Sequence, residues 1–217
     1  MEICRFVVSP IQANCYILAE SLERGAKAVI VDPGDIHLDP VFQFIDETGL
    51  RLVANWNTHA HFDHIIGADL VRERYGIPSY VHIDDAEVWK HAHEAHQTFI
   101  GTPAPAVREP DQYVHDGDTF TIGDETFTVW HTPGHSPGSV CFVGSSLVLS
   151  GDTLFAGTVG RTDLDGSSPE DMERSLERIL AWSDDLAIYP GHGHSTNMRT
   201  ERANNRFLVA AAKRDHA

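Results

Sequence analysis

The stretch that decides the fold is Thr58-His59-Ala60-His61-Phe62-Asp63-His64. It follows an apolar, strand-like run at 52–57 and precedes a helical pattern at 65–75. Alternate side chains of an extended segment project to one side, so His59, His61 and Asp63 are expected to point together. The start of the helix turns His64 toward a neighbouring direction. One short loop can therefore supply ligands to two adjacent metal positions.

Three further candidate ligands follow strand-like runs in the second half of the chain. His135 lies in the loop 131–138, Asp152 in 150–153 and His192 in 190–194. Each adjoins glycine, where the backbone is free to bend. Imidazole and carboxylate groups suit Zn²⁺, Fe or Mn²⁺. The sequence therefore predicts two divalent ions, zinc before iron or manganese, that share one carboxylate and keep open positions for water. The seven candidate ligands are His59, His61, Asp63, His64, His135, Asp152 and His192.

The rest of the chain alternates strand-like runs with helical segments. Strands are expected at 3–8, 15–18, 28–31, 80–83 and 186–189, and hairpins at 119–130 and 139–149. Helices are expected at 41–48, 84–96 and 201–213, and another is expected to begin with Ser168 as its cap. Because no low-complexity linker divides the chain, we expect one α/β domain over 1–217, with two packed sheets and helices outside.

Composition and charge restrict the function. The chain has 217 residues and 14 His, and its 32 acidic against 16 basic residues give a formal net charge of −16. A field of that sign repels phosphate groups, which argues against nucleic acid and anionic membranes as partners. The three cysteines do not form a disulfide framework. No leader pattern and no apolar run of the roughly 18 residues that span a bilayer are present, so a cytoplasmic protein is expected.

With these motifs the sequence resembles the metallo-β-lactamase superfamily, and within it the hydroxyacylglutathione hydrolase (glyoxalase II) type. The resemblance runs from 14–16 through 31–34 to 207–208. It implies a four-layer αββα sandwich. It also implies one metal ion at His59, His61 and His135, and a second at Asp63, His64 and His192, with Asp152 bridging. His194 is expected not to be a ligand.

Departures from the family pattern bear on the subtype. His61 stands where redox di-iron relatives carry Glu, and Asp152 stands where many metallo-β-lactamases carry Cys. Only 25 residues follow His192, so the helical extension of the long glyoxalase II form is not expected. The chain therefore resembles the short, single-domain hydrolases.

The expected activity is hydrolysis of a small-molecule acyl thioester such as S-lactoylglutathione. Two divalent ions can lower the pKa of a shared water from 15.7 to about 7, so hydroxide is available as the nucleophile, with Asp63 as the catalytic group that orients it. A thiolate, with a parent pKa of about 8.5, leaves without a strong acid. Arg161 and Arg199 are candidates for binding an anionic substrate. For Arg161 an ion pair with Asp163 or Asp165 is an equal alternative.

Other interpretations stay open. A mono-iron persulfide dioxygenase, a lactonase or other ester hydrolase, and a non-enzymatic metal-binding protein are the alternatives. Ser136 lies in a G-x-S-x-G pattern, but a serine nucleophile is disfavoured because Pro137 has no N–H for the oxyanion hole. The spacing of His91, His93 and His96 does not stack them on one helix face, so they are expected to face solvent or the substrate opening. His37, His82, His115, His131 and His216 are expected to be structural or on the surface.

Overall fold

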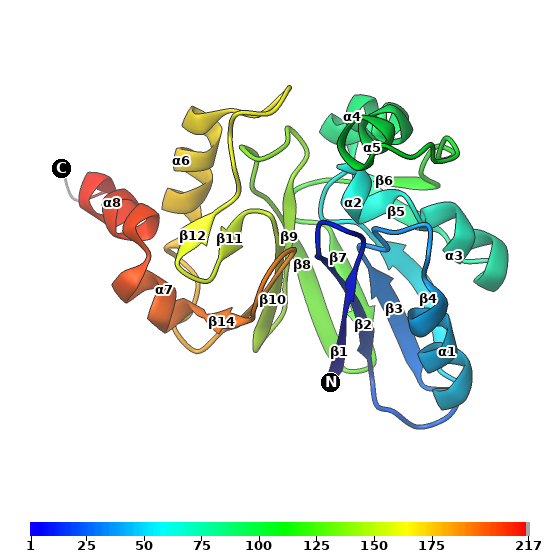
Figure 1. Cartoon of the computed structure of the whole chain (residues 1–217). Helices are drawn as coiled ribbons and strands as arrows, with labels where there is room; N and C mark the ends of the chain where they lie inside the picture. Colours follow the sequence, from blue (N-terminus) through cyan, green and yellow to red (C-terminus); the bar gives the residue numbers. More distant parts are fainter. Residues whose placement is uncertain (216–217) are drawn as a thin grey trace.

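Two six-stranded sheets face each other in the computed structural model, which describes residues 1–215 (Figure 1). The first sheet has three antiparallel strands and then continues in parallel, in the order β1 (Glu2–Val8), β2 (Ala13–Ala19), β3 (Lys27–Val31), β4 (Arg51–Trp56), β5 (Ser79–His82), β6 (Gln112–Val114). The second sheet has the order β14 (Thr196–Asn197), β13 (Ala187–Pro190), β10 (Leu147–Gly151), β9 (Val140–Val143), β8 (Glu125–His131), β7 (Thr119–Ile122). In this sheet β10 pairs with β13 in parallel, and the other named strand pairs are antiparallel. A small ribbon of β11 (Leu154–Phe155) and β12 (Thr158–Val159) adjoins it.

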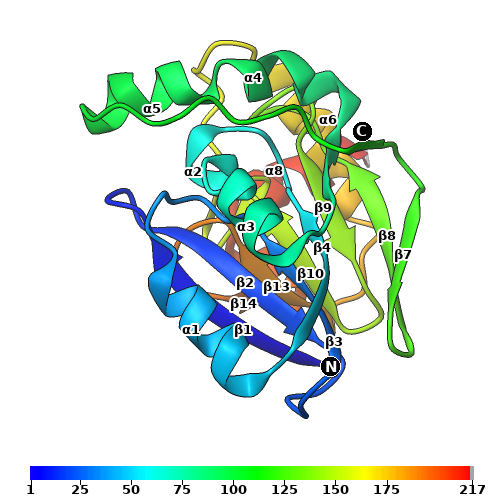
Figure 2. The same ribbon diagram turned by 90° about the vertical axis from the view of Figure 1, so that its right-hand side faces the viewer.

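Helices cover the outer faces of both sheets (Figure 1). On the first sheet lie α1 (Asp39–Thr48), α2 (Phe62–Ile65) and α3 (Ala68–Tyr75). On the second lie α6 (Pro169–Ile179), α7 (Met198–Asn204) and α8 (Arg206–Asp215). A 3₁₀ turn, η1 (Ile83–Asp85), leads into α4 (Ala86–Lys90) and α5 (Ala92–Ile100), which run across one end of the molecule above α2 (Figure 2). Among the described residues, no helix has the length and apolar character needed to cross a membrane.

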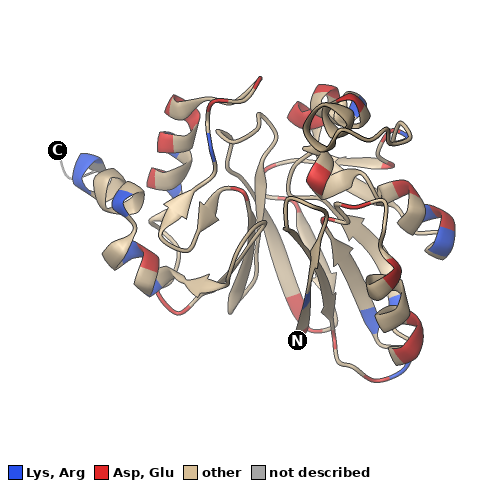
Figure 3. Cartoon of the chain, in the orientation of Figure 1, with Lys and Arg blue, Asp and Glu red and all other residues tan. Residues whose placement is uncertain are grey.

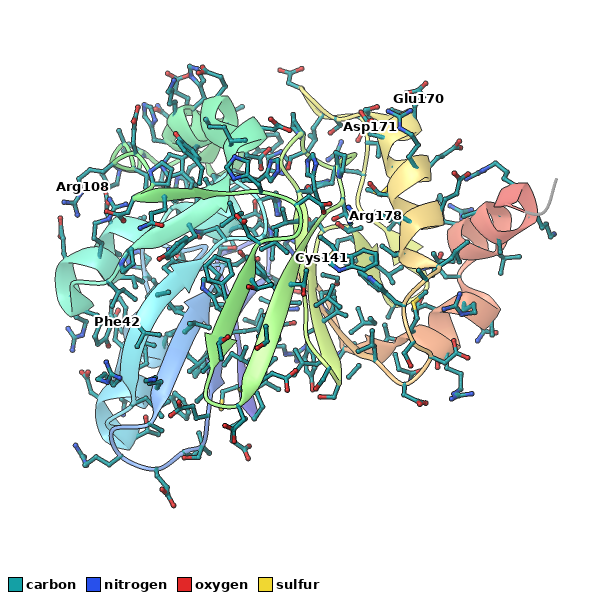
Figure 4. The ribbon with its side chains drawn as sticks, turned by 180° about the vertical axis from the view of Figure 1, so that it is seen from behind. Phe42, Arg108, Cys141, Glu170, Asp171 and Arg178 are labelled. Atoms are coloured by element: carbon teal, nitrogen blue, oxygen red, sulfur yellow. The ribbon has the colours of Figure 1, made fainter. Side chains whose placement is uncertain are left out.

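Hydrophobic contacts between the layers hold the elements together, and a further cluster packs α4 and α5 on α2 and β5. Between the sheets, Trp56 is buried and stacks on Phe142 with ring centroids 5.0 Å apart. One outer layer lies under α1 and α3, and the other lies between the second sheet and α6, α7 and α8. In this outer layer Arg178 of α6 lies 4.6 Å over the ring of Trp130 and pairs with Asp116 (Figure 4). The arrangement confirms the predicted α/β fold, a four-layer αββα sandwich.

Several element boundaries differ from the sequence-based expectation. Ser168 caps α6 as predicted, since its Oγ accepts from the N–H of Asp171 at 3.1 Å. The helix expected at 65–75 is two helices, because Gly67 packs against the backbone of the Asp32-Pro33-Gly34 turn and donates to Pro33 O. The helix expected at 201–213 is interrupted by the extended Asn205.

The helix expected at 84–96 does not begin with Asp84 as its cap and Glu87 as the partner of that cap. His82 caps the 3₁₀ turn instead, accepting the N–H of Asp84 at Nδ1. His91 then divides the expected helix into α4 and α5. The short strands β6, β11, β12 and β14 were not predicted, because two or three residues carry no readable periodicity.

Candidate metal centre

The candidate ligands come from the ends of four strands. His59 follows β4, His135 follows β8, Asp152 follows β10 and His192 follows β13. Because β10 and β13 are parallel, their carboxyl ends lie at the same edge of the second sheet. The loops after all four strands meet at the end of the sandwich where α2 lies (Figure 1). The fold thereby gathers residues that are up to 133 positions apart in the sequence.

Three histidines form an all-histidine cluster. It consists of His59, His61 and His135, whose nearest ligand atoms all lie within 4.8 Å of one another. His61 Nδ1 is 2.9 Å from His135 Nε2, and the ring of His59 lies 4.8 Å from that of His61. His59 and His135 are buried. The cluster carries no negative charge of its own.

Asp63, His64 and His192 form a second, aspartate-containing cluster beside the first. Asp63 Oδ2 lies 3.0 Å from His192 Nε2 and 3.4 Å from His64 Nε2. His64 is fully buried, whereas the side chain of His192 is 27% exposed. The expectation that Asp63 lies in an extended segment is wrong, because Asp63 and His64 both belong to the first turn of α2. This turn brings the two side chains to the same group.

Asp152 lies between the two clusters. Its Oδ2 is 3.3 Å from His135 Nε2 in the all-histidine cluster. Its Oδ1 is 3.6 Å from His64 Nε2 in the aspartate-containing cluster. Ligand bonds of about 2.0–2.2 Å in a tetrahedral zinc site place neighbouring donor atoms about 3.3 Å apart. The carboxylate is therefore in the position that a shared ligand requires.

Unpaired polar atoms support a metal at both clusters. Among the described residues, the buried atoms His59 Nε2, His64 Nε2 and Asp152 Oδ1 have no hydrogen-bond partner. A buried polar atom without a partner costs about 1–3 kcal/mol. All three atoms belong to the groups that imidazole and carboxylate ligands form around divalent ions. The donor set therefore fits two metal ions.

The other ring nitrogens of the histidines are bonded to the protein. His64 Nδ1 lies 2.9 Å from Asp32 Oδ2, and His135 Nδ1 lies 2.9 Å from Arg161 O. His192 Nδ1 lies 3.1 Å from Gln12 O. Because these oxygens accept a hydrogen bond from Nδ1–H, they keep the proton on Nδ1 and leave the Nε2 lone pair for a metal.

Asp32 links His64 to the segment that carries His59. It accepts from the N–H and the Oγ1 of Thr58, both at 2.7 Å, and it contacts His64. The sequence indicated only a turn at Asp32, because its partners lie more than 25 positions away.

A family comparison agrees with this geometry. The model described as the metallo-beta-lactamase superfamily matches residues 8–192. The chain belongs to this superfamily. The hydroxyacylglutathione hydrolase GloC of Haemophilus influenzae is 30% identical over 93% of this chain and 95% of its own.

Two solved structures have folds similar to that of this chain. The BLEG-1 B3 metallo-beta-lactamase gives a TM-score of 0.87 with 33% identity, covering 96% of this chain and 100% of its own. TTHA1623, solved in a di-iron-bound form, gives 0.84 with 34% identity, covering 94% of this chain and 100% of its own. The superfamily and the fold predicted from the sequence are confirmed.

The position of Arg199 does not favour the predicted role in binding an anionic substrate. Its guanidinium pairs with Asp185 at 2.8 Å and with Asp184 at 3.8 Å. These aspartates precede β13, whereas His192 follows it, so Arg199 lies at the opposite end of that strand.

Arg161 lies nearer the site but is paired. Its guanidinium donates to both carboxylate oxygens of Asp163, at 2.6 and 2.9 Å. In Figure 3, a blue segment marks basic charge on the coil between β12 and α6, where Arg161 lies, and further basic residues lie on the outer helices. The alternative of an ion pair with Asp163 is what the structure contains.

The remaining histidines take other roles. His96 is buried and its Nδ1 lies 2.9 Å from Thr102 O, whereas His91 is exposed. His82 and His131 stack with their rings 3.9 Å apart at 13°, and Asp84 lies beside them. Parallel rings cannot both aim a lone pair at one ion, and His131 Nε2 already contacts Pro137 O at 2.8 Å. We therefore assign no ion there. His216 lies outside the described residues.

The two clusters differ in their affinity for protons. Burial lowers the pKa of His61 to about 4, and His135 beside it acts in the same direction. Burial would also lower the pKa of His64, but Asp63, Asp152 and Asp32 outweigh it and raise that pKa well above the usual range. Burial would raise the pKa of Asp63, yet His64 and His192 hold it well below normal.

The metal-free protein should show this contrast directly. In ring ¹⁵N spectra we expect His61 to stay neutral from pH 8 until the pH approaches about 4, while His64 stays protonated above its ordinary pKa of about 6.5. Unfolding lets His61 take up a proton below about pH 6.5, so its burial destabilises the metal-free fold as the pH falls from there to about 4. Titration of both rings near pH 6.5 would contradict the assigned environments.

Proposed function

We propose that the chain is a metal-dependent hydrolase of small-molecule acyl thioesters. The observation that carries the proposal is Asp152, which lies between an all-histidine cluster and an aspartate-containing cluster within 3.3 and 3.6 Å of their ring nitrogens. Two ions at these clusters, zinc first and iron or manganese as alternatives, would supply an activated water and polarise the carbonyl group. GloC, a hydroxyacylglutathione hydrolase, supports this choice of reaction by its similarity over nearly the whole chain.

The chain's own residues suit an acyl-transfer reaction. His64 and His192 keep Asp63 ionised, so its carboxylate can accept a hydrogen bond from a water molecule and orient that water toward a bound carbonyl. The partly exposed side chain of His192 gives solvent and substrate access to this side of the site. A thiolate leaves with a parent pKa of about 8.5, so the reaction needs no dedicated acid.

The carrier thiol is proposed only as a class. Arg199 pairs with Asp185 and Arg161 pairs with Asp163, so neither guanidinium by itself favours an anionic thiol over a neutral one. We therefore propose thioesters in general, with S-lactoylglutathione as one member to test.

A thiol-release assay tests the proposal. Protein reconstituted with Zn²⁺, Mn²⁺ or Fe²⁺ is given acyl thioesters of neutral and of anionic thiols, with Asp63→Asn as the matched variant. We expect the wild type to release thiol and Asp63→Asn to release it more than about 100-fold more slowly. Changes to residues outside the ligand set typically cost only about 10–100-fold.

Parallel substrates separate the alternatives. A persulfide with an oxygen electrode, a homoserine lactone and a β-lactam are assayed with the same preparations. Thiol release no faster than that of Asp63→Asn would overturn the thioester proposal. Oxygen uptake with one iron per chain would establish the dioxygenase instead, and turnover confined to the lactone or the β-lactam would establish those hydrolases.

A further inference from the structure

Asp85 is a buried carboxylate directly behind the all-histidine cluster. It lies in η1 and is fully buried. Its Oδ2 accepts from the N–H of Ala60 at 2.7 Å and from Ser136 Oγ at 2.8 Å. Its Oδ1 accepts from the N–H of Gly138 at 2.6 Å. One side chain from a third segment is therefore bonded to both segments that carry the cluster.

The bonded positions are adjacent to the ligands. Ala60 lies between His59 and His61, and Ser136 follows His135. The two segments are 74 positions apart at His61 and His135, whose ring nitrogens lie 2.9 Å from each other. Asp85 thus links the segments at the point where their spacing sets the distance between ligand atoms.

The loop that carries His135 approaches Asp85 so closely at Gly138 that a side chain would not fit there. A Cβ at Gly138 would lie 2.6 Å from the backbone nitrogen of Asp85 and 2.7 Å from its Cγ, so only glycine fits there. Ser139 Oγ lies 2.8 Å from Ser136 Oγ and accepts the N–H of Ser136. The Ser136 hydroxyl is therefore buried and used in this network, which removes it as a nucleophile.

Burial and hydrogen bonding act in opposite directions on the charged form of Asp85. Its three bonded donors are neutral groups, and a buried charge compensated only by neutral donors is costly. Burial accordingly raises the pKa of Asp85, against the effect of these donors. The all-histidine cluster contains no carboxylate, whereas the other cluster has Asp63. A cation among the three histidines would offset the buried charge.

We infer that Asp85 is a positioning residue for the all-histidine cluster, which fixes the spacing of its two ligand segments and favours a cation there by its charge. The inference rests on the metal role proposed above. Partners outside the ligand set that orient metal ligands typically contribute 10–100-fold to metal affinity.

Asp85→Asn tests this inference with a matched control elsewhere. Glu201 is also a buried carboxylate bonded to three neutral donors, Gly157 N–H, Thr196 Oγ1 and Asn205 Nδ2, none of which is a candidate ligand or its neighbour. Glu201→Gln therefore carries the same kind of destabilisation without touching a ligand segment. Melting temperatures of both variants show how much of any effect is general.

The readout is metal affinity, measured by competition between the full-length protein and a chelator for Zn²⁺ and Co²⁺. The Asp63→Asn background isolates the all-histidine cluster. There we expect Asp85→Asn to weaken binding about 10–100-fold, and Glu201→Gln to change it less than twofold. Ser136→Ala, which removes one donor to Asp85, should give an intermediate loss and replaces Asp85→Asn if that variant does not fold.

The outcomes separate this inference from the proposed function. Affinities in Asp85→Asn within twofold of the parent, or an equal loss in Glu201→Gln, would overturn the positioning role while leaving the hydrolase intact. Wild-type protein that binds no ion would overturn the proposed function and this inference together.

Discussion

Replacing Asp152 with asparagine should remove at least one bound ion per chain and lower thioester turnover by more than about 100-fold. Asp152 contributes to both clusters, through Oδ2 near His135 and Oδ1 near His64. An asparagine keeps the shape but loses the negative charge and turns an N–H₂ donor toward one of the ring nitrogens. Changes outside the ligand set already cost up to about 100-fold, so removal of a shared ligand should cost more.

Metal content and thiol release measured on the same preparation check this prediction. Asp165→Asn, the same change at an exposed position nearby in the sequence, should leave both quantities unchanged. If Asp152→Asn kept two ions and near wild-type turnover, the carboxylate would not be a shared ligand and the assignment of the two clusters would be wrong.

Gly191→Ala should remove at least one ion from the site by adding a single methyl group. A Cβ at Gly191 would lie 2.1 Å from Asp152 Oδ1 and 2.7 Å from His64 Cε1. The backbone cannot move away easily, because Gly191 donates to Gly151 O at 2.8 Å and accepts from Asn14 N–H at 2.7 Å. The methyl group must therefore displace both ligands. We expect the loss of one or both ions and more than about 100-fold lower turnover, comparable to a change of ligand.

His194→Ala is the control for this segment. His194 is exposed, lies three positions further along the chain and is expected not to be a ligand. Its replacement should leave the metal content at the wild-type value. Gly191→Ala protein that retains two ions would show that Asp152 and His64 are not held where the structure places them. A loss of metal in His194→Ala would place a ligand at His194.

Most of the candidate site could be read from the sequence because its residues are chemically distinctive. His59, His61, Asp63 and His64 lie within six positions, and His135, Asp152 and His192 each follow a strand beside glycine. These features can be read locally, since residue type and strand ends are local properties. The two sheets and most strands could be predicted for the same reason, from alternating apolar runs.

The supporting residues could not be predicted in this way. Asp32 and Asp85 act through hydrogen bonds to Thr58 and to Ala60 and Ser136, which are 25–51 positions away. Nothing in the local pattern around either aspartate distinguishes it from an ordinary turn or cap residue. Their roles depend on how the sheets bring the loops together.

The position of Arg199 could not be predicted for a related reason. Arg199 was a candidate because an anionic substrate needs a basic group near the site, and it follows His192 by only seven positions. The short strand β14 and the start of α7 intervene and carry Arg199 to the other end of β13, where Asp184 and Asp185 hold it. Distance along the chain is a poor guide where the direction of the chain reverses.

We propose that the seven candidate ligands, from His59 to His192, hold two ions and that these ions make the chain a thioester hydrolase. The most direct test of this proposal adds Zn²⁺ stepwise to metal-free protein and follows thiol release at each addition. We predict tight binding that ends at two ions per chain, with turnover rising to its maximum at that point and absent without metal. If the protein bound no ions, the assignment of the metal centre would be wrong. If it bound two ions but released thiol no faster than Asp63→Asn, the proposed hydrolase activity would be wrong.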